Sequence, residues 1–213
     1  MSKHVLITGA TRGIGRACAD LFLAANWAVT AVARTATDLA AMKKEYPGAQ
    51  LTTVAVDLSS EAGAEGIPAV FYDVVLLNAA AFAPGPLLGE EDLYEHLQRV
   101  NVLANHRLAR RLLPLLRARG AGHLVVIGSR GTDFQPEHLT AYVATKYALR
   151  GLFLGWAAEL SGSGVRATLV APGATLTSSW DDEEPPADIL MPEAVAEVVW
   201  EVVREEREGR VVV

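Results

Sequence analysis

Residues 8–15, Thr8-Gly9-Ala10-Thr11-Arg12-Gly13-Ile14-Gly15, decide the fold of this chain. They follow an apolar run at residues 3–8 and open a segment of helical period at residues 13–26, so they turn a first strand into a first helix. Glycine suits this turn because it accepts unusual backbone angles and lets a diphosphate approach bare main chain. The helix that follows offers unpaired N–H groups and a positive dipole end to that charge. Any tight strand–helix turn can use glycines in this way. The position of residues 8–15 at the first strand–helix junction nevertheless favours dinucleotide binding.

Short apolar runs alternate with longer helical segments along the rest of the chain. The runs are almost continuously apolar, which is typical of strands covered on both faces. We expect strands at residues 3–8, 28–33, 51–56, 73–77, 123–128 and 165–170, and a last short one at 210–213. We expect helices at residues 13–26, 37–46, 140–161 and about 192–206, with only a short or ragged helix at 61–68. Residues 93–119 are expected to form a helix pair or one long helix, with a kink at Pro114. Regular alternation predicts one α/β domain over residues 1–213, built on a doubly wound parallel sheet.

Composition narrows the classes of function. The chain has 213 residues, of which 51% are hydrophobic and 21% charged, the balance of a folded soluble protein. Its net charge of −6 argues against nucleic-acid binding through phosphate contacts. The single cysteine, Cys18, excludes an intrachain disulfide and suits a reducing compartment.

Neither a membrane span, a signal peptide nor a metal site is predicted. The longest uncharged stretch, residues 74–89, contains prolines and a glycine that a spanning helix would not tolerate. The apolar run at the N-terminus is too short for a signal peptide, so we expect a cytoplasmic protein. The five histidines are scattered without metal-ligand spacing.

Four polar residues form a candidate catalytic group. Tyr142 and Lys146 lie four residues apart in Tyr-Val-Ala-Thr-Lys and therefore on one helix face. Tyrosine, with an ordinary pKa of about 10, is a poor base at neutral pH, and a nearby cation favours its phenolate. Ser129 stands at a strand end, and Asn101 lies inside a predicted helix, where its propensity does not explain it. Taken singly, Tyr142 and Lys146 fit a solvated helix face, Ser129 a turn, and Asn101 a hydrogen bond to the backbone across a kink. Taken together, their order and spacing favour a catalytic role.

The glycine spacing Thr-Gly-x-x-x-Gly-x-Gly, together with this Asn–Ser–Tyr–Lys group, resembles the short-chain dehydrogenase/reductase family, to about residue 177. The resemblance implies a Rossmann fold and an oxidoreductase that transfers hydride between a nicotinamide and a carbonyl or alcohol carbon of a small-molecule substrate. It implies that Tyr142 acts as general acid in reduction and as base in oxidation. Lys146 would lower the pKa of Tyr142 and hold the nicotinamide ribose, and Ser129 would hydrogen-bond the substrate oxygen. Asn101 would position a water that links Lys146 to solvent.

The same resemblance implies the cofactor contacts. Asp57 corresponds to an adenine-contacting aspartate, although a turn cap explains it as well, and it can be both. Asn78 corresponds to the first residue of an Asn-Asn-Ala-Gly motif, in which Ala79 and Ala81 replace the second Asn and the Gly. Residues 172–177, Pro-Gly-Ala-Thr-Leu-Thr, resemble the segment that contacts the nicotinamide carboxamide and the phosphates. The full predicted set is Gly9, Thr11, Arg12, Gly13, Ile14, Gly15, Arg34, Asp57, Leu58, Asn78, Ala79, Tyr142, Lys146, Pro172, Gly173, Thr175 and Thr177.

The end of the second strand favours NADP(H) over NAD(H). A carboxylate there would bind a free ribose 2′-hydroxyl, whereas arginine would bind a 2′-phosphate. Arg34 follows the strand directly, and Arg12 in the glycine loop adds a second cation. Asp38 fits better in the first turn of the next helix, where a negative charge suits the dipole.

An NADP(H)-dependent oxidoreductase is therefore the leading prediction. The alternative is a non-catalytic NADP(H)-binding sensor or partner module that retains the fold, against which Ser129, Tyr142 and Lys146 argue. A related epimerase or dehydratase would need a longer substrate domain and a different glycine spacing.

Two further expectations concern the lid and the assembly. Residues 178–191, with an acidic run at 181–184, are expected to form a substrate-lid loop in which Trp180 either anchors the loop or contacts substrate. In the family, the helices corresponding to residues 93–119 and 140–161 pair across a dimer axis, which implies a homodimer or homotetramer.

Overall fold

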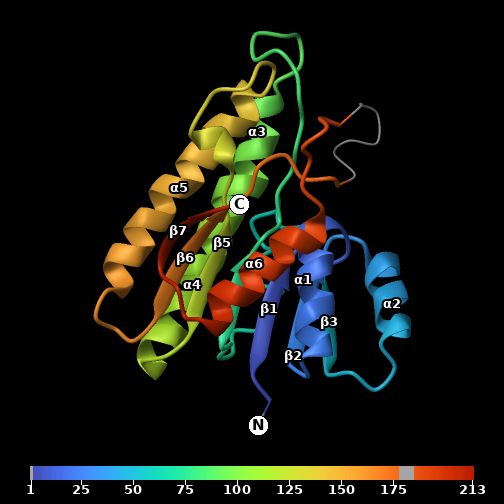
Figure 1. Ribbon diagram of the computed structural model, residues 1–213, viewed down its shortest axis with the longest axis vertical. Helices are drawn as coiled ribbons and strands as arrows, with labels where there is room; N and C mark the ends of the chain where they lie inside the picture. Colours follow the sequence, from blue (N-terminus) through green and yellow to red (C-terminus); the bar gives the residue numbers. More distant parts are fainter. Residues whose placement is uncertain (1, 178–184) are drawn as a thin grey trace.

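Seven parallel strands form the sheet at the centre of the computed structural model, which describes residues 2–177 and 185–213 (Figure 1). The strands are β1 (His4–Thr8), β2 (Ala28–Ala33), β3 (Leu51–Ala55), β4 (Val74–Leu77), β5 (His123–Ile127), β6 (Arg166–Ala171) and β7 (Gly209–Val212). Their order is β3-β2-β1-β4-β5-β6-β7, and every pair is parallel. The doubly wound parallel sheet is thus confirmed. The strand order reverses between β1 and β4, and at such a point a ligand crevice opens beyond the carboxyl ends of the strands.

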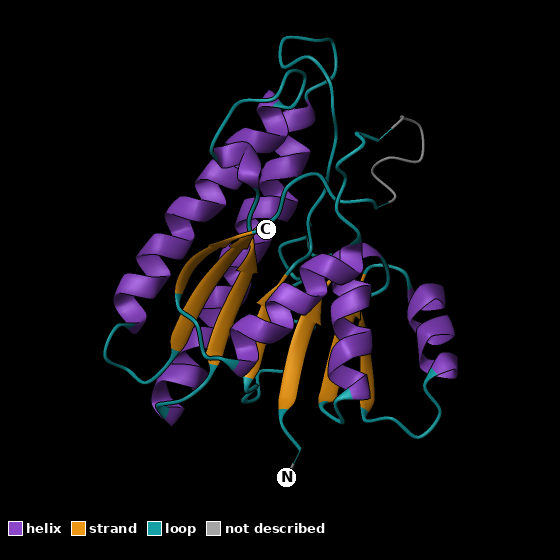
Figure 2. Cartoon of the chain, viewed as in Figure 1, coloured by secondary structure: helices purple, strands orange, loops and turns teal. Residues whose placement is uncertain are grey.

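Helices cover both faces of this sheet (Figure 2). They are α1 (Gly13–Ala24), α2 (Ala36–Glu45), α3 (Leu93–Gln98), α4 (Asn105–Arg119), α5 (Thr140–Leu160) and α6 (Pro192–Arg204). Val5 and Ile7 of β1 pack in a core with α1, α2 and α6, whereas Leu6 between them packs in a second core with α4 and α5. The near-continuous apolar strands of the sequence follow from this double covering.

The helical region at residues 93–119 contains a wider turn than an α-helix. A π-helical segment, Arg99–Ala104, joins α3 to α4, and α4 continues through Pro114 to Arg119. Asp92 caps the start of α3, since its side chain accepts hydrogen bonds from two main-chain N–H groups of the first turn. A π-bulge changes the direction in which side chains project, and such segments occur often at functional sites.

The short or ragged helix expected at residues 61–68 does not form, so this prediction was wrong. Residues 61–66 form successive turns instead. A Cβ atom at Gly63 would lie 2.1 Å from the carbonyl oxygen of Asp57, and one at Gly66 would lie 2.6 Å from a methyl carbon of Val56. The segment is packed so closely against the residues after β3 that these two positions have no room for a side chain.

Candidate active site

The glycine loop leaves the start of α1 open to a ligand. Gly9 and Gly13 have φ angles of +69° and +53°, which other residues rarely adopt. A Cβ atom at Gly15 would lie 2.1 Å from the carbonyl oxygen of Gly9, so the helix can begin this close to the strand only with glycine there. Arg12 precedes the first helical residue and makes no side-chain cap, and the first turn carries no acid. The main-chain N–H groups of that turn are therefore available to an anion, as a cofactor phosphate requires.

Asn78 holds the glycine loop against the next strand. Its Nδ2 donates to the carbonyl oxygens of Thr8 and Gly9, at 2.9 and 3.2 Å. The Thr8 hydroxyl oxygen accepts the main-chain N–H groups of Asn78 and Ala79, both at 3.0 Å. The ends of β1 and β4 are thus joined at the place where the strand order reverses, and the replacement of the motif's second Asn by Ala79 leaves this bracing in place.

Arg34 and Asp57 lie beyond the ends of β2 and β3. The Asp57 carboxylate accepts the hydroxyl and main-chain N–H of Ser59, at 2.8 and 2.9 Å. These two hydrogen bonds, with a smaller contribution from the nearby charge of Arg34, lower the pKa of Asp57. Asp57 is therefore a turn cap, whether or not it also contacts an adenine. Asp38 lies in the first turn of α2, where the sequence interpretation put it.

Tyr142, Lys146 and Ser129 meet at the carboxyl edge of the sheet. Lys146 is 2% exposed, and its Nζ donates to the carbonyl oxygen of Ile127 at 3.1 Å and lies 5.6 Å from the centre of the Tyr142 ring. Burial raises the pKa of Tyr142 to about 12, against an opposing hydrogen bond with Ser129. Burial also lowers the pKa of Lys146 to about 8, so that this ammonium can exchange a proton near neutral pH. The Ser129 oxygen accepts the N–H of Gly131 at 3.0 Å, which leaves its own hydrogen to be donated.

Asn101 joins two parts of this site from within the π-helical segment. It is fully buried, and its side chain pairs with both main-chain groups of Ala81: Oδ1 accepts the N–H at 2.7 Å and Nδ2 donates to the carbonyl at 3.0 Å. Nδ2 also donates to the Thr145 hydroxyl at 2.9 Å, and that hydroxyl donates to the carbonyl oxygen of Tyr142 at 2.6 Å. The Asn101 carbonyl accepts Nδ2 of Asn105 at 2.8 Å. Both amide hydrogens of Asn101 are therefore used within the protein, across the helical irregularity.

Residues 172–177 cross from the end of β6 toward the glycine loop. The Pro172 carbonyl accepts the N–H of Arg130 at 2.9 Å, which ties this segment to the residue after Ser129. Leu190 pairs with Thr175 in a parallel bridge. At the far end, a methyl carbon of Thr177 lies 2.9 Å from the position of a Cβ on Gly13. The segment thus links the candidate catalytic residues to the phosphate loop.

The remaining predicted residues are placed differently. Leu58 and Ile14 pack against the two hydrophobic cores, so that mainly their main chains could face a ligand. Trp180 and the acidic run at 181–184 lie outside the described residues. Thr145, Asn105, Ala81 and Phe82 were missed by sequence reasoning. Thr145 and Asn105 follow Tyr142 and Asn101 by three and four residues, a spacing that places each pair on one helix face.

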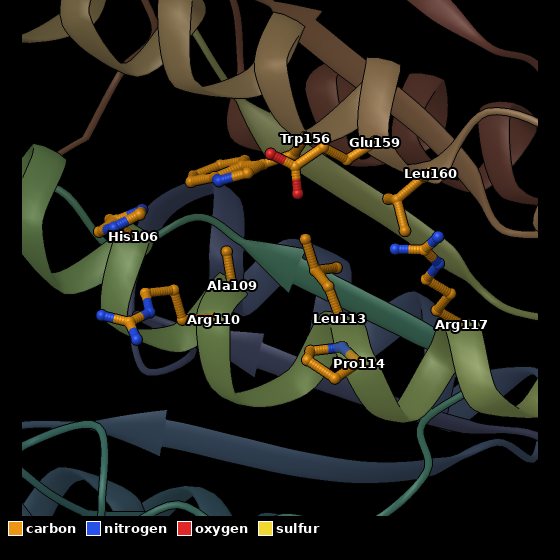
Figure 3. Close-up of a pocket in the computed structure, with 9 residues that line it drawn as sticks. All are labelled: His106, Ala109, Arg110, Leu113, Pro114, Arg117, Trp156, Glu159 and Leu160. Atoms are coloured by element: carbon orange, nitrogen blue, oxygen red, sulfur yellow. The ribbon is translucent and has the colours of Figure 1, made fainter.

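A groove lies away from this site, on the outer side of α4 and α5 (Figure 3). It has a volume of about 510 Å³ and is lined by His106, Ala109, Arg110, Leu113, Pro114, Arg117, Trp156, Glu159 and Leu160. The rings of His106 and Trp156 are nearly parallel, with an interplanar angle of 8°. A second hollow continues along α5 past Gly151 and Gly155, where added Cβ atoms would meet nothing within 4 Å.

The described residues show neither a metal-binding cluster nor a membrane-spanning helix. Across residues 2–177 and 185–213, no three His, Cys, Asp or Glu side chains come together as a metal site would need. In the same residues, no helix combines the length and apolar character that crossing a bilayer requires.

Known proteins show the same fold and related sequences. A family model described as short chain dehydrogenase matches residues 3–187. A serine 3-dehydrogenase of Rhizobium radiobacter is 32% identical over 182 residues, covering 81% of this chain and 72% of that protein. An NADP-dependent 3-hydroxy acid dehydrogenase of Salmonella typhimurium is 31% identical over 217 residues, covering 92% of this chain and 87% of that protein.

Two solved structures extend the likeness. A closed form of serine dehydrogenase complexed with NADP⁺ superposes with a TM-score of 0.90 at 26% identity, covering 99% of this chain and 94% of the other. A short-chain dehydrogenase from Sphingobium yanoikuyae in complex with NADPH gives 0.88 at 26% identity, covering 99% and 87%. Sequence, strand order and superposition agree, and the chain belongs to the short-chain dehydrogenase/reductase family of oxidoreductases.

Proposed function

We propose that this protein is an NADP(H)-dependent oxidoreductase that interconverts a carbonyl group and an alcohol in a small molecule. The observation that carries the proposal is the meeting of Ser129, Tyr142 and buried Lys146 at the sheet edge that also holds the glycine loop. The residues fit the cofactor, because the start of α1 is open to an anion and Gly15 has no room for a side chain. The nicotinamide, when bound, would supply or accept the hydride.

Four side chains would carry out the proton transfer and hold the substrate and the cofactor. In reduction, the Tyr142 phenol gives its proton to the substrate oxygen while the carbonyl carbon gains the hydride; in oxidation, the phenolate takes the proton back. Ser129 donates a hydrogen bond to that oxygen, with its own oxygen held by the N–H of Gly131. Lys146 stabilises the phenolate through its charge and holds the nicotinamide ribose. Asn101 fixes the helix that carries Tyr142 through Thr145.

Two arginines support a preference for NADP(H). The guanidinium groups of Arg12 and Arg34 are exposed and form no hydrogen bond or ion pair with the part of the chain that the structure describes. Both stand where a 2′-phosphate would meet the ends of β1 and β2. Relatives whose names include NADP point the same way. Fluorescence titrations of nucleotide-free protein test this: NADPH should bind at least tenfold more tightly than NADH, about 1.4 kcal/mol. Tighter binding of NADH would overturn the preference and leave the enzymatic proposal standing.

The groove on α4 and α5 supports assembly as a homodimer or homotetramer. Leu103 and Leu154 are exposed, and the small residues on α5 allow close approach of another helix. Arg110 and Glu159 both line the groove, so a two-fold axis can set the arginine of one copy against the glutamate of the other. Light scattering on a size-exclusion column tests this, and a monomer at micromolar concentration would contradict it.

Turnover separates the enzyme from a non-catalytic binding module. Purified protein with NADPH and a panel of aldehydes and ketones should show loss of NADPH absorbance. Tyr142→Phe should abolish this loss and leave the protein able to bind NADPH, because the phenol oxygen is the proton donor and the other predicted cofactor contacts are kept. Wild-type protein that binds NADPH but reduces none of the carbonyls would favour the binding module.

A further inference from the structure

An aromatic side chain packs directly on the candidate proton donor. The centre of the Phe82 ring lies 5.0 Å from the centre of the Tyr142 ring, with an interplanar angle of 71°. This edge-to-face arrangement is the favourable one for two aromatic rings, and it restricts rotation of both. Phe82 comes from the segment after β4, so the contact joins that segment to α5.

The main chain next to Phe82 is held in place. Ala81 has its N–H and its carbonyl both bonded to the Asn101 side chain, at 2.7 and 3.0 Å. The same side chain reaches Thr145, which bonds to the carbonyl of Tyr142. Asn101 therefore fixes the main chain beside Phe82 and, through Thr145, the main chain of Tyr142. The contact between the two rings links these segments a second time. An arrangement fixed at both backbones is suited to hold the phenol at one position.

The contact with Tyr142 also brings Phe82 close to the proposed position of the reacting carbonyl. A carbonyl oxygen that accepts hydrogen bonds from Tyr142 and Ser129 brings the two substituents of its carbon next to the side chains packed on Tyr142. Phe82 is only partly buried, so part of the residue stays accessible for contact with such a substituent. An apolar substituent gains from covering this surface, whereas a hydroxyl or charged group would lose hydration there.

We propose that Phe82 is a positioning residue for the Tyr142 phenol and an apolar wall of the substrate site, selecting carbonyl compounds with an aromatic or branched alkyl group beside the carbonyl. This inference rests on the proposed function. It names the substrate class through a residue outside the Asn–Ser–Tyr–Lys group.

Kinetics with two ketones test the proposal. Propanone and acetophenone differ in the group beside the carbonyl, and each is reduced with NADPH by wild type, Phe82→Ala and Phe82→Leu. In Phe82→Ala we expect KM for acetophenone to rise about tenfold, the scale of one lost aromatic contact, while KM for propanone changes less than about twofold. We expect kcat to fall for both ketones, because the phenol is held less well. Phe82→Leu keeps apolar bulk and should recover most of the KM for acetophenone.

Phe71→Ala is the matched control. Phe71 is partly buried in the core under α4, near the start of β4 and thus at the opposite edge of the sheet. The Phe71→Ala variant should leave the ratio of the KM values for acetophenone and propanone unchanged. The affinity for NADPH should be the same in all variants. An unchanged ratio in Phe82→Ala, or an equal change in Phe71→Ala, would overturn the inference and leave the proposed function intact. A wild type that binds NADPH and reduces no carbonyl would refute the proposed function, and with it the substrate role of Phe82.

Discussion

His123 makes the stability of this protein depend on pH in a calculable way. The imidazole is 4% exposed, and its Nε2 lies 2.8 Å from the Thr168 hydroxyl, which donates its own hydrogen to the carbonyl of Arg207. Nε2 must therefore carry a hydrogen and donate it to Thr168. Burial, and then the nearby charge of Arg166, lower the pKa of His123 from 6.5 to about 4. The folded state thus keeps this ring neutral where the unfolded chain would protonate it.

The sign and size of the effect follow from this difference. Well above pH 6.5 the ring is neutral in both the folded and the unfolded state, so His123 does not lower the free energy of unfolding. As the pH falls from 6.5 toward 4, the unfolded chain binds a proton that the folded state does not, and the free energy of unfolding decreases. Each pH unit in that interval removes about 1.4 kcal/mol, so wild type should lose about 2 kcal/mol between pH 7 and pH 5 through His123.

Urea unfolding at pH 7, 6 and 5 measures the effect. His123→Gln keeps an N–H donor for Thr168 and removes the titration, so it serves as the reference at each pH. We expect the free energy of unfolding of wild type to fall relative to the variant as the pH decreases. A constant difference between the two proteins over this range would refute the reasoning.

Three other perturbations test the cofactor site, the phosphate loop and the assembly. Arg34→Ala should weaken NADPH binding about tenfold and leave NADH binding unchanged, since only NADPH carries the 2′-phosphate; equal effects on both nucleotides in parallel titrations would exclude that role. Gly15→Ala should lower the affinity for NADPH and NADH alike by at least about tenfold, because the added Cβ would lie 2.1 Å from the Gly9 carbonyl oxygen. Unchanged affinities in calorimetry would contradict this close approach of α1 to the end of β1. Leu154→Glu, at a side chain 60% exposed, should shift the assembly to monomer in light scattering without lowering the melting temperature, and an unchanged mass would place the interface elsewhere.

Strand–helix alternation and the glycine loop were enough to predict the sheet. The nearly continuous apolar runs indicate strands covered on both faces, and the glycine spacing marks the first strand–helix turn, so a doubly wound parallel sheet could be predicted. The strand order itself comes from the structure. The two glycines and the proline at residues 61–68 indicated a weak helix, but the close approach of Gly63 to the Asp57 carbonyl is a tertiary contact that the sequence did not reveal.

The candidate site was predictable in its polar residues and not in what supports them. Tyr142, Lys146 and Ser129 could be named from spacing. The π-helical turn at Asn101 could not, because it depends on hydrogen bonds to a segment 20 residues away in the chain. Phe82 carries no polar signal at all, and only the fold brings its ring to Tyr142.

The proposed reaction passes hydride between a nicotinamide and a carbonyl carbon, with Tyr142 as proton donor. The most direct test uses NADPH deuterated at the transferred C4 position, a carbonyl substrate found in the panel, and mass spectrometry of the alcohol formed. We expect one deuterium on the former carbonyl carbon with wild type, and no labelled alcohol with Tyr142→Phe that still binds the nucleotide. Binding of NADPH without label transfer to any carbonyl, or equal label transfer by Tyr142→Phe, would contradict it.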